Sequence, residues 1–281
     1  MVYQIGNRIL QQTQEILRGK VNDVIVCQDM AANGKVYYTV LVVHDRNLAK
    51  KLMELFHSKT SQNNHRFVVD FTWKNDYLMV FDYVKERSLK QFFSSEVATL
   101  QECEQIAQNL TVECLAGGIP YPILYLQLKQ NQINISKDKS VYLGYNIDLS
   151  QFSGKITEKE CATICAQIIF EYIKEISSQR ATTYKLLEKK VWKSGYQRFT
   201  DLYKDLKMAA LPLEKEGIIL RIKKFVKHHQ DHLFKLLLIV CILLGILALA
   251  MVISQIFFSD VPFLRIFFNP FKVIGTESLL Q

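Results

Sequence analysis

The stretch Leu236–Ile253, LLLIVCILLGILALAMVI, divides the chain into two parts. Its eighteen consecutive residues include no charged, amide or hydroxyl side chain. As a helix with a rise of about 1.5 Å per residue, the stretch would cover roughly 27 Å, close to the thickness of a bilayer's hydrocarbon core. A buried core helix is the alternative, but such helices usually carry polar residues on at least one face. We therefore predict a single transmembrane helix over residues 236–258.

Positive charge is concentrated just before this helix. Residues 213–235 include six lysines and arginines, whereas residues 259–281 include two. Because lysine and arginine are retained on the cytoplasmic side of a membrane, the amino-terminal part should be cytoplasmic and the tail extracytoplasmic. Residues 1–20 hold no apolar run typical of a signal peptide. We expect anionic lipid headgroups to contact the basic juxtamembrane residues Arg221, Lys223, Lys224 and Lys227.

About 235 residues precede the apolar stretch, which is enough for one large or two small domains. Aromatic residues make up 11% of the chain, and it has 11 glycines and 5 prolines, so we expect a folded chain. The net charge of +8 is compatible with nucleic-acid binding. Since much of the excess lies beside the predicted membrane helix, we expect no nucleic-acid partner.

Six cysteines show no paired CxxC spacing, and we expect them to be small buried hydrophobic residues in a reducing compartment. Cys161 and Cys165 are four residues apart and could lie on one helix face, but no third or fourth metal ligand is apparent. The histidines at 228, 229 and 232 are better explained as part of a basic juxtamembrane helix. We therefore predict no metal.

Apolar periodicity predicts an antiparallel sheet with one helix packed on it, followed by a mainly helical second half. The predicted strands are 23–28, 36–43, His65–Trp73, Tyr77–Tyr83, Gln132–Ile135 and Val141–Leu143, and the predicted helices are Asn47–His57, Ser88–Phe93, Leu100–Ala116, Lys159–Ile176 and Tyr196–Ala210. Pro120 and Pro122 are expected to end the helix that precedes them.

Three segments of the chain resemble segments of protein kinases. Tyr77–Phe93, YLMVFDYVKERSLKQFF, looks like the last small-lobe strand, the interlobe hinge and the first large-lobe helix. Ile123–Ile135, ILYLQLKQNQINI, resembles the catalytic loop and the strand after it, and Val141–Ser150, VYLGYNIDLS, lies where the DFG segment would come. The resemblance implies an α+β fold, a truncated two-lobed protein-kinase-like domain followed by a single transmembrane helix. It places a small lobe at 1–84, a reduced helical large lobe at 85–212 and a juxtamembrane segment at 213–235.

The residues at the chemical positions depart from the family. The HRD triplet is matched by Tyr125, Leu126 and Gln127, so an amide stands in place of the catalytic aspartate. Gln132 falls on the metal-binding asparagine, and Tyr145 begins the triplet that matches DFG. Phosphoryl transfer requires carboxylate oxygens to bind Mg²⁺ and to orient the acceptor. We therefore predict a pseudokinase that is not an enzyme and has no cofactor.

The predicted small lobe also lacks residues that kinases use to bind phosphates. Residues 36–43 include no lysine that could pair with Glu54, and Arg18-Gly19-Lys20 stands in place of the glycine-rich loop. Asp148, three residues after Tyr145, is the acidic candidate near the metal position.

A cytosolic kinase-like domain, a basic segment and one membrane helix, in this order, are similar in architecture to the pseudokinase-like membrane subunit of Gram-positive type VII secretion systems. The 23-residue tail is shorter than the extracytoplasmic domain of that family. The resemblance implies a bacterial scaffold that binds other membrane or secretion-assembly proteins, or forms a homo-oligomer. The alternative is a divergent membrane-bound serine/threonine kinase or a nucleotide-sensing signalling domain.

Overall fold

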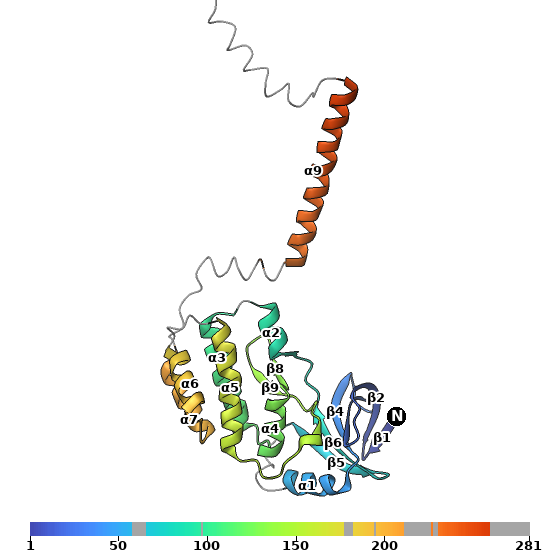
Figure 1. Ribbon diagram of the computed structural model, residues 1–281. Coiled ribbons are helices and arrows are strands. Elements are labelled where there is room, and N and C mark those ends of the chain that lie inside the picture. The colour runs from blue at the N-terminus through green and yellow to red at the C-terminus, as the bar shows by residue number, and fades with distance from the viewer. Residues whose placement is uncertain are drawn as a thin grey trace, which may run out of the picture. The chain divides into compact units, whose positions relative to one another are not determined.

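The computed structural model describes residues 1–57, 66–96, 98–176, 182–193, 195–210, 226 and 230–258. The chain divides into two compact units, Met1–Lys215 and Glu216–Gln281. The first unit mixes helices with β-sheet, which confirms the predicted α+β class, and the second contributes one long helix (Figure 1). The predicted juxtamembrane residues Arg221, Lys223, Lys224 and Lys227, together with the tail 259–281, lie outside the described residues.

Six antiparallel strands form the larger sheet, in the order β1-β2-β3-β4-β6-β5. Their bounds are β1 Val2–Ile5, β2 Arg8–Leu17, β3 Asn22–Asp29, β4 Val36–Val43, β5 Phe67–Trp73 and β6 Asp76–Asp82. Apolar periodicity did not predict the first two strands. In β2, RILQQTQEIL, polar residues lie on both faces of much of the strand, which removes the alternating pattern that identifies a half-buried strand.

The larger sheet curls so that its two edges meet. The ring of Tyr3 on β1 makes edge-on contacts with Phe71 and Trp73 on β5, with ring centroids 6.3 and 5.8 Å apart. The concave side encloses its own apolar cluster, which includes Leu10 and Val40. The opposite side of the sheet is therefore the one that packs on the rest of the unit.

The helix α1, Arg46–Phe56, packs on this opposite side. It begins at Asp45, whose Oδ1 accepts hydrogen bonds from the backbone N–H groups of Asn47 and Leu48, both at 2.8 Å. The helix buries Leu52 and Phe56 against the sheet.

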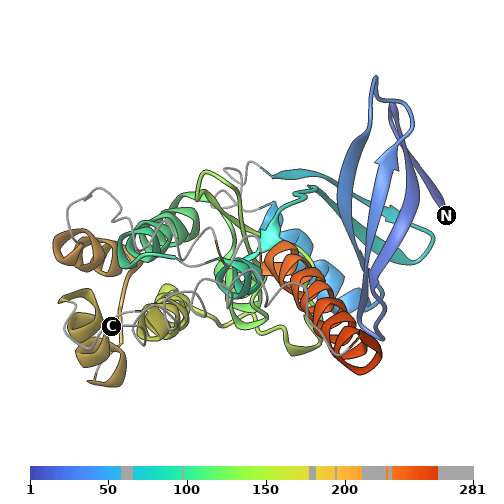
Figure 2. The ribbon, with the colours of Figure 1, turned by 90° about the horizontal axis from the view of Figure 1, so that it is seen from above.

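The second half of the unit consists of helices around a small three-stranded sheet, in the order β7-β8-β9. Its elements are β7 Arg87–Ser88, α2 Leu89–Ser95, α3 Leu100–Ala116, α4 Tyr121–Lys129, β8 Ile133–Ile135, β9 Val141–Leu143, η1 Leu149–Gln151, α5 Glu158–Ile176, α6 Thr182–Lys193 and α7 Phe199–Ala209. Most of the predicted elements are present. Seen from above, the larger sheet lies at one end of the unit and α6 and α7 lie at the other (Figure 2).

The prediction of a loop at the residues matched to HRD is wrong. Tyr125, Leu126 and Gln127 lie on the helix α4, which begins after Pro120. Pro122 occupies the first turn of α4, where a missing N–H leaves no hydrogen bond unmade. The prolines therefore precede or open a second helix, while α3 ends at Gly117.

One apolar core runs from the larger sheet into the helical half without interruption. It joins Leu41 and Phe81 of the sheet to Leu110 of α3, Leu126 of α4 and Ile169 of α5. The two predicted lobes therefore share a common packed interior.

The long helix of the second unit is α9, Gln230–Phe258. Among the described residues, this is the one helix long and apolar enough to cross a membrane, over Phe234–Ile253, and none of that stretch is buried within the structure. The predicted apolar segment is therefore helical over its whole length.

Candidate functional site

The residue matched to the catalytic aspartate, Gln127, is completely buried. Its Nε2 donates a hydrogen bond to the backbone carbonyl of Gly144 at 3.0 Å. Its Oε1 has no hydrogen-bond partner among the described residues. Because a carboxylate has no N–H to donate, an ionised acid at this position could not make the bond to Gly144.

Gln132 lies in the turn between α4 and β8 and is half-buried. Its backbone N–H donates to the carbonyl of Gln127 at 2.8 Å, and its own carbonyl accepts from Gly144 N–H at 2.7 Å. The three residues Gln127, Gln132 and Gly144 are thus linked by backbone and side-chain hydrogen bonds. The structure brings two of the predicted positions together through these bonds.

Tyr145, at the first DFG-like position, is buried and stacks on Phe81 of β6. The ring centroids are 3.6 Å apart and the ring planes differ by 10°. Phe81 in turn contacts Phe56 of α1 and Phe67 of β5, with centroids 5.7 and 5.6 Å away. Aromatic contacts therefore run along one side of the sheet, from α1 to the segment after β9.

Two further amides fix the backbone after Tyr145. Asn22, at the start of β3, donates from Nδ2 to the carbonyl of Ile147 at 3.0 Å and accepts from Leu149 N–H at 2.8 Å. Gln130 donates to the carbonyl of Asp148 at 2.7 Å and accepts from its N–H at 2.8 Å. This segment is therefore held from the sheet on one side and from the end of α4 on the other.

The carboxylate of Asp148 serves as a helix cap. Its Oδ1 accepts from the backbone N–H of Ser150 at 2.8 Å, and its Oδ2 accepts from the Ser150 hydroxyl at 2.9 Å. These bonds start the short helix η1. We refer to Gln127, Gln130, Asn22, Tyr145 and Asp148 together as the junction.

Two positions of the predicted small lobe, Glu54 and Gly19, can also be located in the structure. Glu54 is exposed on α1. Gly19 lies between β2 and β3, where an added Cβ would lie 2.8 Å from the carbonyl oxygen of Asn22. A glycine is needed there by the close backbone approach, independently of any phosphate.

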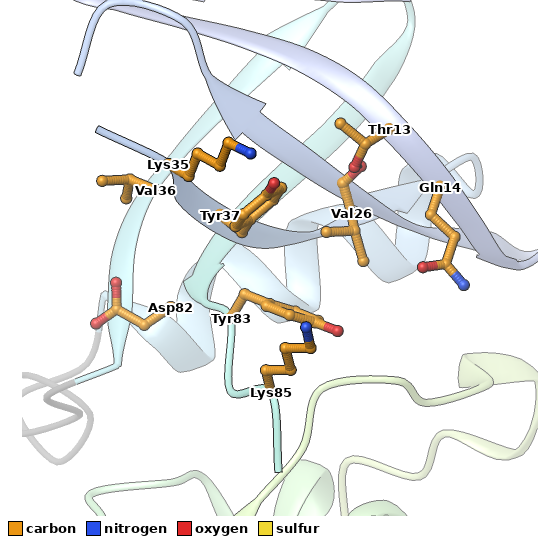
Figure 3. A pocket seen from close by; sticks show the side chains of 9 residues that line it. All are labelled: Thr13, Gln14, Val26, Lys35, Val36, Tyr37, Asp82, Tyr83 and Lys85. Carbon is orange, nitrogen blue, oxygen red and sulfur yellow. The ribbon is translucent and has the colours of Figure 1, made fainter. Parts of the chain in front are cut away.

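An open pocket of about 610 Å³ lies on the sheet, beside the chain that leaves β6. Figure 3 shows its lining, which comes from β2, β3, the start of β4 with the residue before it, and the end of β6 with the residues after it: Thr13, Gln14, Val26, Lys35, Val36, Tyr37, Asp82, Tyr83 and Lys85. Its volume is within the usual range of small-molecule sites.

Two tyrosines and two lysines give this pocket its chemical character. The rings of Tyr37 and Tyr83 have centroids 6.2 Å apart at an angle of 60°, and Tyr83 N–H donates to the carbonyl of Tyr37 at 3.3 Å. Lys35 and Lys85 are exposed and lie beside these rings (Figure 3). The pocket can therefore accept a planar or anionic group. Sequence reasoning missed this pocket, although Lys-Val-Tyr at the start of one strand and Tyr-Val-Lys after another were visible signals.

The cysteines of the first unit are all buried and free. Burial raises the pKa of the Cys103 and Cys161 thiols to about 12, so both remain protonated at neutral pH. Cys161 donates from Sγ to the carbonyl of Tyr121 at 3.3 Å. In the part of the chain that the structure describes, no group of three or more histidine, cysteine or acidic residues is placed to hold a metal.

No protein-family model matches this chain, and no curated protein matches it.

Proposed function

We propose that the chain is a non-catalytic, membrane-anchored pseudokinase that acts as a protein-interaction scaffold in an envelope or secretion assembly. The order of elements supports the kinase-like part of this proposal. A sheet with α1 inserted between β4 and β5 leads through residues 83–86 to α2 and then to a helical half, as the resemblance implies.

The stacking of Tyr145 on Phe81 is the observation that supports the non-catalytic part most strongly. The ring of Tyr145 occupies a buried position where the resemblance places the principal Mg²⁺ ligand, and its phenyl neighbour supplies no anionic oxygen. Gln127 uses its amide to hold a backbone carbonyl. If the residues at the catalytic positions serve packing, the domain would act through recognition of other proteins at its surface.

The anchoring part of the proposal is supported by α9. Its apolar stretch matches a bilayer in length, and the charge excess of residues 213–235 over the tail favours a cytoplasmic first unit. The protein would then be a single-pass protein of the cell membrane with an extracytoplasmic tail.

Cross-linking in native membranes tests the scaffold. The full chain should be captured with a membrane-protein partner or a second copy, and a variant that lacks residues 262–281 should insert equally well but co-purify with less partner. Residues 257–271 include six phenylalanines, four of them in the tail, which favours contact of the tail with an apolar partner over free solution. A full chain that migrates as a lone monomer after mild extraction would contradict the scaffold, and equal partner yields would contradict the role of the tail.

The open pocket favours a second candidate, a nucleotide-sensing domain without phosphoryl transfer. A nucleobase could lie against Tyr37 and Tyr83, and the two lysines could meet phosphates. Thermal unfolding of the full chain in nanodiscs with increasing ATP tests this. Ligand at 100 times its dissociation constant would stabilise the protein by about 2.7 kcal/mol. A saturable rise in melting temperature with ATP would favour the second candidate if Lys85→Ala removes it and Lys50→Ala, at an exposed position of α1, does not.

A further inference from the structure

The helices α6 and α7 expose two large apolar side chains to solvent. Trp192 near the end of α6 is 77% exposed, and Met208 near the end of α7 is 76% exposed. Folded domains rarely leave a tryptophan so uncovered, because its ring is among the largest apolar groups that a chain can bury. The described residues of the first unit leave these two side chains uncovered, which indicates that a partner contacts them.

The exposed face of α6 is basic. Thr183, Tyr184 and Leu187 are buried on the opposite face of this helix. Lys185, Lys189 and Lys193 follow at intervals of four residues, and Trp192 lies seven residues after Lys185. All four side chains are exposed and lie along one face because helical positions three, four and seven residues apart are neighbours.

The neighbouring helix α7 continues this surface. It buries Phe199, Leu202 and Leu206, and it exposes Lys204, Lys207 and Met208. Lys204 and Met208 line an open depression of about 270 Å³ together with Lys190 of α6. The two helices therefore meet at this depression, and we call their exposed residues together the α6–α7 face.

Cations outnumber anions on these two helices and their connection. Residues 182–209 contain seven basic side chains and three acidic ones, which are Lys185, Lys189, Lys190, Lys193, Arg198, Lys204 and Lys207 against Glu188, Asp201 and Asp205. Asp205 is already engaged, since its Oδ2 pairs with Lys190 and accepts the Tyr196 hydroxyl at 3.0 Å. Because this pair uses one charge of each sign, six cations and two anions remain, an excess of four positive charges.

We propose that the α6–α7 face docks on a bilayer surface rich in anionic phospholipids. Each exposed lysine or arginine near such a surface contributes roughly 1 kcal/mol, and tryptophan favours the level of the headgroups. Twenty residues, 210–229, separate α7 from α9, so the connection reaches at most about 70 Å. The inference rests on the membrane anchoring in the proposed function, and it does not depend on the kinase resemblance.

Docking through this face would orient the first unit. The α6–α7 face and the larger sheet lie at opposite ends of that unit (Figures 1 and 2). The sheet and its open pocket would then point away from the bilayer, where soluble partners can reach them.

Tryptophan fluorescence tests the docking, because the chain has two tryptophans, Trp73 and Trp192. Full-length Trp73→Phe, which retains Trp192, is reconstituted in vesicles of phosphatidylcholine with or without phosphatidylglycerol, using acyl chains that carry bromine as the quencher. We expect Trp192 to be quenched and blue-shifted in the anionic vesicles, and to be released at high salt. The matched variant Trp192→Phe retains Trp73, which packs on Tyr3, and should be quenched equally little in both vesicles.

Charge reversal provides the second measurement. Lys189→Glu with Lys193→Glu should reduce the quenching of Trp192 at least twofold in anionic vesicles, whereas Lys50→Glu with Lys51→Glu on α1 should leave it unchanged. Quenching of Trp192 no greater than that of Trp73, or equal in neutral and anionic vesicles, would overturn the docking. A blue shift without bromine quenching would identify a protein contact in place of lipid and would also overturn it. A chain that carbonate strips from the vesicles would instead overturn the anchoring itself.

Discussion

At the scale of single residues, amide side chains hold the backbone of the junction through hydrogen bonds. Asn22, Gln127 and Gln130 each bind backbone groups of residues 144–149, and two of them donate and accept at once. An amide can do both because it carries N–H donors and a carbonyl acceptor, whereas a carboxylate only accepts. The amide of Gln127 thus makes a buried hydrogen bond that an ionised acid at the same position could not make.

Gln127→Glu tests this explanation directly. The ionised carboxylate would face the Gly144 carbonyl in a buried position, so we expect the free energy of unfolding to fall by about 2 kcal/mol or more. The measurement is urea unfolding of the full chain in nanodiscs at neutral pH. The control Gln105→Glu, on the exposed face of α3, should change the free energy of unfolding by about 0.5 kcal/mol at most. Equal effects of the two variants would contradict a structural role for Gln127.

At the scale of elements, one histidine links three strands. His44 follows β4, and its Nε2 and Nδ1 lie 3.2 Å from Asp23 Oδ2 on β3 and 3.0 Å from Asp76 Oδ1 on β6. Burial lowers the pKa of His44, but hydrogen bonds and charge attraction from Asp76 and Asp23 outweigh it, and the pKa is raised overall. The protonated ring therefore links the end of β4 to the starts of β3 and β6 through two contacts with carboxylates.

His44→Gln should destabilise the protein in a pH-dependent way. A group whose pKa is higher in the folded state stabilises fully below its unfolded pKa of about 6.5, and this contribution is lost as pH rises through the folded value. We expect the melting temperature of the variant to lie furthest below that of the parent chain near pH 5.5 and to approach it above pH 8. A gap that widens with rising pH would show that the two carboxylates do not act on this ring.

The sequence predicts the elements best where periodicity is strong. The predicted helix Leu100–Ala116 is confirmed with the same bounds because Thr99 caps it and Gly117 ends it. The helix α4 was missed because prolines were interpreted as terminators, although Pro122 fits a first turn. The packing at the junction could not be predicted, because Phe81 and Tyr145 are 64 residues apart and meet only through the fold.

At the scale of the whole molecule, a compact first unit is joined to a helix that is long and apolar enough to span a bilayer. The five cysteines of the first unit are buried and Cys241 lies in the apolar stretch, so single new thiols can report topology. With a membrane-impermeant maleimide, Ser278→Cys in the tail should be labelled in intact cells. Ser153→Cys, at an exposed site of the first unit, should be labelled only after lysis. The reverse pattern would contradict a cytoplasmic first unit.

ATP turnover by the reconstituted full chain tests the central claim, that this domain does not transfer phosphoryl groups. Asp148, three residues after Tyr145, is the acidic candidate for the expected metal position, and its carboxylate accepts hydrogen bonds from the backbone N–H and the hydroxyl of Ser150. With Mg²⁺ or Mn²⁺, we predict that ADP release equals the protein-free blank for both the parent chain and Asp148→Asn. Release above the blank in the parent chain that Asp148→Asn abolishes would contradict the claim, because it would assign the carboxylate to the chemistry of phosphoryl transfer.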